Sequence, residues 1–129
     1  MKIQEKFDLT GRVAVVTGGV GLLGAEFCRT LAEAGAAVAV VDLDESASQA
    51  VAESLTGSGY QALGVPADIT QPASVNAGVD KVRSTFGRID ILVNSAALDP
   101  KFDPDAVNKG ITPGAFEDYP LDLWNSALH

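Results

Sequence analysis

The sequence contains little of what a disulfide framework, a membrane span or a nucleic-acid surface needs. One cysteine in 129 residues allows no disulfide within the chain, which fits a reducing, cytoplasmic setting. No apolar run is long enough to span a bilayer, and no signal segment opens the chain. The nine basic residues stand against 17 acidic ones, and this net charge of −8 disfavours nucleic acid and anionic membrane surfaces as partners.

Candidate catalytic and metal-binding side chains are equally scarce. The single histidine, His129, is the last residue, and no cluster has the spacing of metal ligands. Cys28 falls inside an expected helix, where a buried cysteine is usually an inert packing residue. We therefore assign no catalytic residue and no metal site.

What the chain does contain is a regular alternation of apolar strands and amphipathic helices within a single domain. Strands are expected at residues 13–17, 37–42, 61–65 and 89–94, and helices at 22–34, 46–58 and about 71–87. Continuous apolar strands separated by helices indicate a parallel sheet that is covered on both faces.

Two details of the helices can also be predicted. The first helix is expected to bury one stripe of side chains, formed by Leu23, Phe27, Leu31 and Ala34. The second helix is expected to begin at a capping box formed by Ser46 and Gln49.

The pattern breaks down between Leu98 and Pro120, a stretch with four prolines and two glycines. One interpretation is a mobile segment. The other is a lid or substrate loop, because the stretch leaves the carboxyl end of a strand, where sheets of this kind bind ligands. Residues 121–129 are then expected to begin a helix, with Trp124 as a packing residue.

A glycine-rich turn, Thr17-Gly18-Gly19-Val20-Gly21-Leu22-Leu23-Gly24, lies between the first strand and the first helix. Backbone N–H groups at such a helix start can bind phosphate. Gly18 would form the tight turn, Gly21 would let a pyrophosphate approach, and Gly24 would let the helix pack closely. A turn that binds nothing is the alternative, but the order strand, turn, helix, strand, acid favours a dinucleotide site.

The acid in that order is Asp42, which ends the second strand 24 residues after Gly18. Its carboxylate could accept hydrogen bonds from both ribose hydroxyls of an adenosine, and it would repel a 2′-phosphate. No lysine or arginine lies between Val38 and Ser48 to offset that repulsion. The sequence therefore predicts NAD rather than NADP, and a solvated carboxylate at a strand end is the alternative.

Two further polar residues follow the third and fourth strands. Asp68 could accept a hydrogen bond from an adenine amino group, with Ile69 against the ring, or it could cap the next helix. Asn94 begins an Asn-Ser-Ala-Ala segment whose small residues leave space for a ribose, but its amide could equally hold the strand ends together. These alternatives stay open at the level of the sequence.

Together these segments resemble the short-chain dehydrogenase/reductase family, over residues 7 to about 124. The matching segments are the opening at 7–18, Asp68-Ile69-Thr70, and 90–97. The resemblance implies a Rossmann-type, doubly wound α/β sheet, truncated, with strand order 3-2-1-4. It also implies that residues 1–129 are the N-terminal portion of an NAD(P)-binding domain, with a long loop at 98–120.

The resemblance implies a cytoplasmic oxidoreductase that transfers hydride between NAD and an alcohol or carbonyl substrate, as a homo-oligomer without nucleic-acid or membrane partners. The glycine-rich turn and the resemblance to the family together predict these cofactor-binding residues: Thr17, Gly18, Gly21, Leu22, Leu23, Gly24, Asp42, Leu43, Asp68, Ile69, Asn94 and Ala96.

Two departures from the family pattern are visible. Residues 17–24 have the Thr-Gly-x-x-Gly-x-x-Gly spacing of the larger sugar-nucleotide branch, which puts Leu22 where the single-domain branch has glycine. The segments at Asp68 and Asn94 resemble the single-domain branch, so we keep that placement. Ser95 and Ala97 replace an asparagine and a glycine of the family segment.

The family's Ser, Tyr-x-x-x-Lys pair and helix Asn cannot be assigned here. The residues four positions after Tyr60 and Tyr119 are Gly64 and Leu123. In the family the sheet continues beyond the fourth strand. We therefore expect this chain alone to be inactive, to expose an edge strand, and to be marginally stable, self-associating or covered by a partner.

Two alternatives to this hypothesis come from other functional classes. One is a non-enzymatic module that binds NAD or a partner protein through the 98–120 loop or the open edge. The other is a methyltransferase, which the spacing from Thr17 to Gly24 and the Asn94 segment argue against. The sequence does not identify a substrate.

Overall fold

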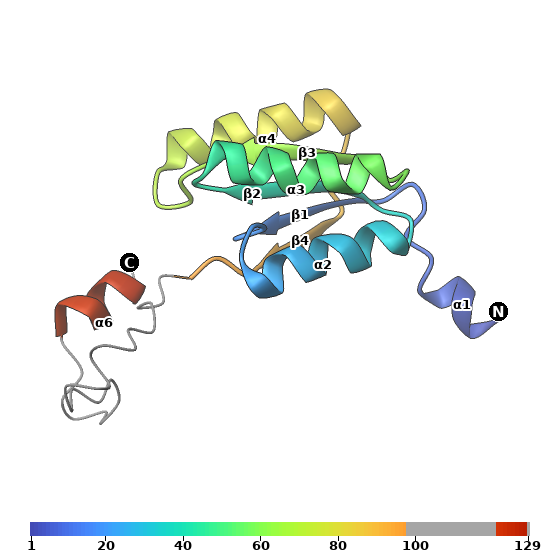
Figure 1. The fold of residues 1–129 in the computed structure, drawn as a ribbon, viewed down its shortest axis with the longest axis horizontal. Coiled ribbons are helices and arrows are strands. Elements are labelled where there is room, and N and C mark those ends of the chain that lie inside the picture. The colour runs from blue at the N-terminus through green and yellow to red at the C-terminus, as the bar shows by residue number, and fades with distance from the viewer. Residues whose placement is uncertain (98–120, 129) are drawn as a thin grey trace. The chain divides into compact units, whose positions relative to one another are not determined.

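The computed structural model describes residues 1–97 and 121–128, so the expected 98–120 loop lies outside the described residues. The chain forms two units, Met1–Ala96 and Ala97–His129. The first unit contains a parallel sheet between layers of helices (Figure 1), and the second contains helix α6 (Leu121–Leu128). A short helix, α1 (Ile3–Lys6), precedes the sheet and was not expected from the sequence.

The sheet has four parallel strands in the order β3-β2-β1-β4, which confirms the predicted fold class and topology. Thr17 pairs with Val41 on one side and with Asn94 on the other, so the carboxyl ends of three strands meet at one edge. The strands are β1 (Val13–Thr17), β2 (Ala37–Asp42), β3 (Ala62–Pro66) and β4 (Ile91–Asn94).

Helices cover both faces of the sheet, as the continuous apolar strands predicted. Helices α2 (Leu22–Glu33) and α3 (Glu45–Gly57) pack on one face against alternate strand residues that include Val16 and Val38. Helix α4 (Pro72–Phe86) packs on the other face, where Val82 lies among residues such as Val13 and Val65. Figure 1 shows α4 on the opposite side of the sheet from α2.

The buried stripe of α2 differs from the prediction. Its buried residues are Gly24, Cys28 and Ala32, whereas Leu23 and Phe27 are 67% and 39% exposed. At the start of the helix the contact needs the smallest residue, because a Cβ on Gly24 would lie 2.0 Å from the Gly18 carbonyl oxygen. Leu31 of the predicted stripe does pack against the same core, so a periodicity count that favours large apolar residues identified only part of the buried face.

The predicted start of α3 was also wrong. The N-cap is Asp44, whose Oδ1 accepts the Ala47 N–H at 3.0 Å, and the Ser46 hydroxyl donates to the same oxygen at 3.1 Å. Aspartate is as good a cap as serine, and here it lies two residues closer to the end of β2. These two hydrogen bonds lower the pKa of Asp44 below its ordinary value, with the Ala47 bond the larger cause.

At the amino ends of the strands, Asp90 connects β4 to β1. Its Oδ2 accepts the Val13 N–H at 2.9 Å, and its Oδ1 accepts from the Arg88 guanidinium and lies 3.6 Å from Arg12. The Arg88 hydrogen bond, followed by the Val13 bond, lowers the pKa of Asp90. This cluster fixes the position of the edge strand at the end opposite the glycine-rich turn.

Candidate functional site

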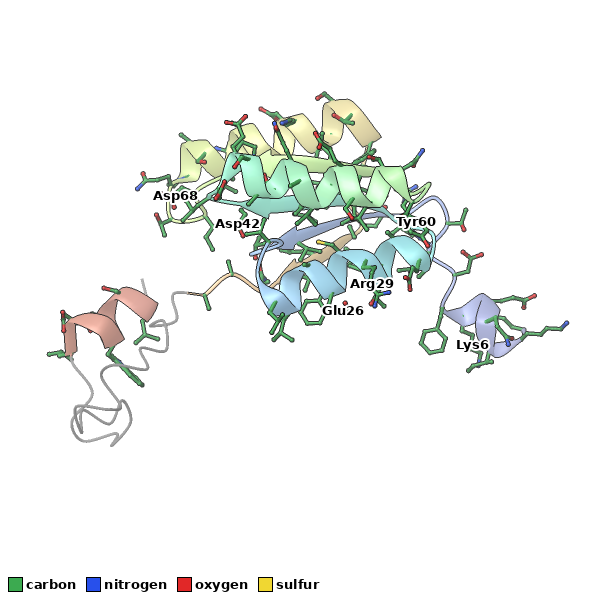
Figure 2. The ribbon with its side chains drawn as sticks, in the orientation of Figure 1. Lys6, Glu26, Arg29, Asp42, Tyr60 and Asp68 are labelled. Carbon is green, nitrogen blue, oxygen red and sulfur yellow. The ribbon has the colours of Figure 1, made fainter. Side chains whose placement is uncertain are left out.

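The candidate site lies at the carboxyl ends of the strands, between β1 and β4. The connection from β1 to β2 runs through α2 on one face of the sheet. The connection from β3 to β4 runs through α4 on the other face, and β4 lies on the opposite side of β1 from β2. Sheets of this type bind ligands at such a reversal of strand order. Figure 2 shows Asp42 and Asp68 at this end of the sheet and Tyr60 at the opposite end, so Tyr60 takes no part in the site.

The glycine-rich turn needs glycine at position 18 for conformation and for space. Gly18 has φ +65°, in the left-handed region that glycine favours. A Cβ on Gly18 would lie 2.7 Å from the Ala96 Cα and 2.9 Å from the Ser95 carbonyl oxygen. The turn is therefore pressed against the segment that follows β4.

The other glycines of the turn meet different neighbours. A Cβ on Gly24 would lie 2.0 Å from the Gly18 carbonyl oxygen, so α2 begins in direct contact with the turn. Gly19 was not among the predicted site residues. Position 19 nevertheless favours glycine, because an added Cβ would lie 2.7 Å from the Val40 Cγ1. Gly21 has an ordinary φ of −66°, and an added Cβ would meet only the Gly18 oxygen, at 3.3 Å.

Thr17 joins β1 to the segment after β4. Its hydroxyl oxygen accepts the N–H groups of Ser95 and Ala96 at 3.2 and 3.3 Å, and its side chain is buried. Thr17 thus holds the strand ends together. This is the structural role that the sequence analysis considered for Asn94. Among the described residues the Asn94 amide makes no such bond, and Asn94 is exposed at the site.

Asp42 lies beside the glycine-rich turn. Its Oδ2 accepts the Val20 N–H at 3.3 Å, and the neighbouring Gly19 N–H donates to the Val41 carbonyl at 3.1 Å. Within the described residues nothing donates to the Asp42 Oδ1. The carboxylate is therefore oriented by the turn and keeps one oxygen available to a ligand.

Asp68 closes a turn rather than capping α4. Its Oδ1 accepts the Thr70 N–H at 3.0 Å and the Thr70 hydroxyl at 2.6 Å, while the N-cap of α4 is Gln71. The Thr70 hydroxyl, followed by the Thr70 N–H, lowers the pKa of Asp68. The capping alternative is wrong, and Asp68 is held as a carboxylate at the edge of the site.

Large apolar side chains surround these carboxylates and are exposed at the same edge. The largest exposed fractions are 93% for Leu22 and 73% for Leu43, and Ile69 is half exposed. Monomeric proteins seldom gather so many exposed leucine and isoleucine side chains without a use. Ala96, which follows β4 and contacts the turn at Gly18, is exposed as well.

A cavity of about 460 Å³ extends from this edge along the α4 side of the sheet. Thr17 and Asn94 line its polar end, and its apolar walls include Val75, Val79 and Leu92. Leu92 is 59% exposed although it lies on a sheet strand. As far as the described residues show, the α4 side of β4 is therefore the least covered part of the sheet.

Among the described residues, neither a reactive cysteine nor a metal site offers an alternative to this candidate site. Cys28 is fully buried in α2, and burial raises the pKa of its thiol to about 12. In residues 1–97 and 121–128 no group of three His, Cys, Asp or Glu side chains could bind a metal ion. In the same ranges, each helix is too short or too polar for a bilayer crossing.

Comparison with known proteins gives matches along the whole sheet. The sequence profile described as short chain dehydrogenase matches residues 12–128. D-threitol dehydrogenase from Mycolicibacterium smegmatis is 41% identical over 98 residues, which cover 76% of this chain and 38% of that protein.

Two solved structures have the same fold as this chain. A short-chain type dehydrogenase/reductase from Mycobacterium marinum superposes with a TM-score of 0.80 and 32% identity, over 98% of this chain and 47% of that one. A 7α-hydroxysteroid dehydrogenase in complex with NADH and 7-oxo glycochenodeoxycholic acid superposes with a TM-score of 0.77 and 31% identity, over 98% of this chain and 45% of that one. The chain thus spans less than half the length of these three relatives.

Proposed function

The chain belongs to the short-chain dehydrogenase family, and from this premise we propose that its first 97 residues bind the adenosine diphosphate part of NAD. The backbone N–H groups at the start of α2 would hold the pyrophosphate. The close contacts of Gly18 and Gly24 keep that helix start against the ends of β1 and β4. The NADH complex of the related hydroxysteroid dehydrogenase supports the choice of cofactor.

The orientation of Asp42 carries this proposal. The Val20 N–H holds Oδ2 beside the turn, while Oδ1 has no donor among the described residues. A dinucleotide whose pyrophosphate lies on the turn brings its adenosine ribose next to that carboxylate. Asp42 would then accept hydrogen bonds from the ribose hydroxyls.

Asp68 and the exposed leucines would complete the adenine pocket. The Asp68 Oδ1 accepts from Thr70, while none of the described residues donates to Oδ2, which would accept a bond from the adenine amino group. Leu43 and Ile69 are exposed after the ends of β2 and β3, where they would lie against the ring. We propose Thr17, Leu22, Leu23, Asn94 and Ala96 as the remaining residues of the site, with Thr17 acting through the 95–96 backbone.

The test is calorimetric titration of the 129-residue chain with NAD and with NADP. We expect tighter binding of NAD, because the Asp42 carboxylate repels a 2′-phosphate. Asp42→Ala should weaken NAD binding by about tenfold or more, since a hydrogen bond to a charged group contributes roughly 1.5–3 kcal/mol. Asp42→Asn should lose less NAD affinity than Asp42→Ala and should narrow the difference between NAD and NADP.

Asp80→Ala is the matched control, because it removes the same charge from an exposed position on α4 outside the site. Equal affinity for NAD and NADP in the unmodified chain would contradict the proposal. So would an Asp42→Ala variant that binds NAD as tightly as the Asp80→Ala variant does.

We further propose that residues 1–129 form the N-terminal portion of an NAD-binding domain in an oxidoreductase of the length of its relatives. NAD supplies the hydride acceptor in such a reaction. The name of the D-threitol dehydrogenase supports a small hydroxylated or carbonyl compound as substrate. The 129-residue chain by itself is expected to bind NAD without oxidising an alcohol, and a spectrophotometric assay for NADH tests this.

A further inference from the structure

The two edges of the sheet are built differently. On β3, the Gln61 carbonyl accepts the Val38 N–H and the Ala67 N–H donates to the Asp42 carbonyl, both at 2.9 Å. In a parallel ladder, alternate residues of a strand bond to the same neighbour. The backbone groups of residues 61, 63, 65 and 67 therefore face β2, and those of 62, 64 and 66 face outward.

Two of these three outward positions are already occupied or lack a donor. The Lys81 amine, which comes from α4, donates to the Gly64 carbonyl at 3.0 Å. Pro66, the last residue of β3, has no N–H to offer to another strand. An unprotected edge presents a row of free N–H and C=O groups on which another strand can pair.

The β4 edge has neither feature. The Asp90 N–H donates to the Val13 carbonyl at 2.9 Å, so the backbone groups of Ile91 and Val93 face outward by the same alternation. Neither residue is a proline, and within the described residues no lysine donates to β4. Within the described residues, the sheet is thus protected at β3 and unprotected at β4.

We propose that Lys81 and Pro66 together close the β3 edge against addition of a strand from a second copy of this chain. Lys81 occupies the carbonyl at the centre of the outward row, and its charge would be desolvated by an incoming strand. Because Pro66 has no N–H, the outward-facing backbone groups of β3 include one hydrogen-bond donor fewer at the end of the strand. Any pairing between copies is then confined to β4.

The experiment compares Lys81→Met and Pro66→Ala with the unmodified 129-residue chain by sedimentation velocity over a range of concentrations. Lys81→Met keeps the aliphatic stem and the helix preference of the side chain but removes the donor. Each variant should associate about tenfold more tightly than the unmodified chain, and the double variant more tightly still. Far-UV circular dichroism at the lowest concentration checks that each variant is folded.

Lys6→Met is the control for charge, because Lys6 lies on α1 outside the sheet (Figure 2). Hydrogen exchange locates the contact: in the associated variants, the outward-facing amides of Ala62 and Gly64 should gain protection. The proposal is overturned if neither variant associates more tightly, if Lys6→Met has the same effect, or if protection is gained only at residues 91–94. Pro66→Ala keeps the test decisive should Lys81→Met fail to fold.

Discussion

The glycines of the turn meet two separate requirements, one of the fold and one of the proposed ligand. Gly18 and Gly24 are required by the protein itself, since added Cβ atoms would overlap backbone atoms of Ala96 and Gly18. Gly21 has an ordinary backbone conformation, and its nearest neighbour is 3.3 Å from an added Cβ. The fold thus needs glycine less strictly at position 21 than at 18 or 24, and the absence of a side chain there is what the approach of a phosphate requires.

Substitution by alanine separates the two requirements. Gly24→Ala should destabilise the fold by about 3 kcal/mol or more, because the backbone of the turn must move. Gly21→Ala should change the free energy of unfolding by less than about 1 kcal/mol but should weaken NAD binding. Urea unfolding and NAD titration measure the two effects. Normal stability of Gly24→Ala, or normal NAD binding by Gly21→Ala, would contradict these assignments.

The sequence predicted where the candidate residues lie in the fold better than it predicted their contacts. The glycine spacing and the acid after β2 are local signals, and they placed Gly18 and Asp42 correctly at one sheet edge. The hydroxyl of Thr17 bonds to backbone 78 and 79 residues further along the chain, so no local pattern reveals it. The same applies to Gly19, whose need for glycine depends on Val40 in the neighbouring strand.

At the scale of the elements, one carboxylate fixes the edge strand. Asp90 ends the loop before β4 and binds the first backbone N–H of β1 together with the Arg88 and Arg12 guanidinium groups. Its side chain is 13% exposed, so these bonds are partly shielded from water. The pairing of β4 with β1 therefore includes an ionised side chain as well as the backbone ladder.

We expect Asp90→Asn to be less stable than the unmodified chain at pH 7 and less sensitive to acid. The folded state lowers the pKa of Asp90 below its ordinary value of 3.8. Its contribution to stability is therefore present above about pH 4 and is lost as the pH falls through the lower, folded-state pKa. Urea unfolding between pH 7 and pH 2 should show a smaller acid loss for Asp90→Asn.

Asp80→Asn is the control for this comparison, because Asp80 is exposed on α4 and makes none of the described hydrogen bonds. It should be nearly as stable as the unmodified chain at pH 7. Parallel pH profiles for Asp90→Asn and the unmodified chain would show that Asp90 does not couple protonation to folding.

The element boundaries were predictable where a signal is local and were missed where packing decides. Strands β1 and β2 have the predicted bounds, since each is a continuous apolar run that ends at a turn residue. The cap of α3 moved from Ser46 to Asp44, because several residues there can cap and the end of β2 determines which one is in place. Part of the α2 stripe was missed because the helix packs through its small residues.

At the scale of the whole molecule, only one of the two outer edges of the described sheet is protected against pairing with another strand. The β3 edge carries the Lys81 contact, whereas no described strand pairs with the outer edge of β4, and an open apolar cavity lies over the α4 face of β4. The sequence predicted this exposed edge from the resemblance alone, since apolar patterning cannot distinguish an edge strand from a central one. We expect the 129-residue chain to self-associate through the β4 side.

Leu92→Thr should weaken that association without loss of stability. Leu92 is 59% exposed on a wall of the cavity, so threonine removes apolar surface that faces water, and as a β-branched residue it suits a strand. The free energy of unfolding should change by less than about 0.5 kcal/mol, while sedimentation should show weaker association and the dye ANS should fluoresce less. Leu22→Thr is the control, since Leu22 is even more exposed but lies outside the cavity. If Leu22→Thr reduces association as much as Leu92→Thr does, then general surface hydrophobicity rather than the β4 face holds the copies together.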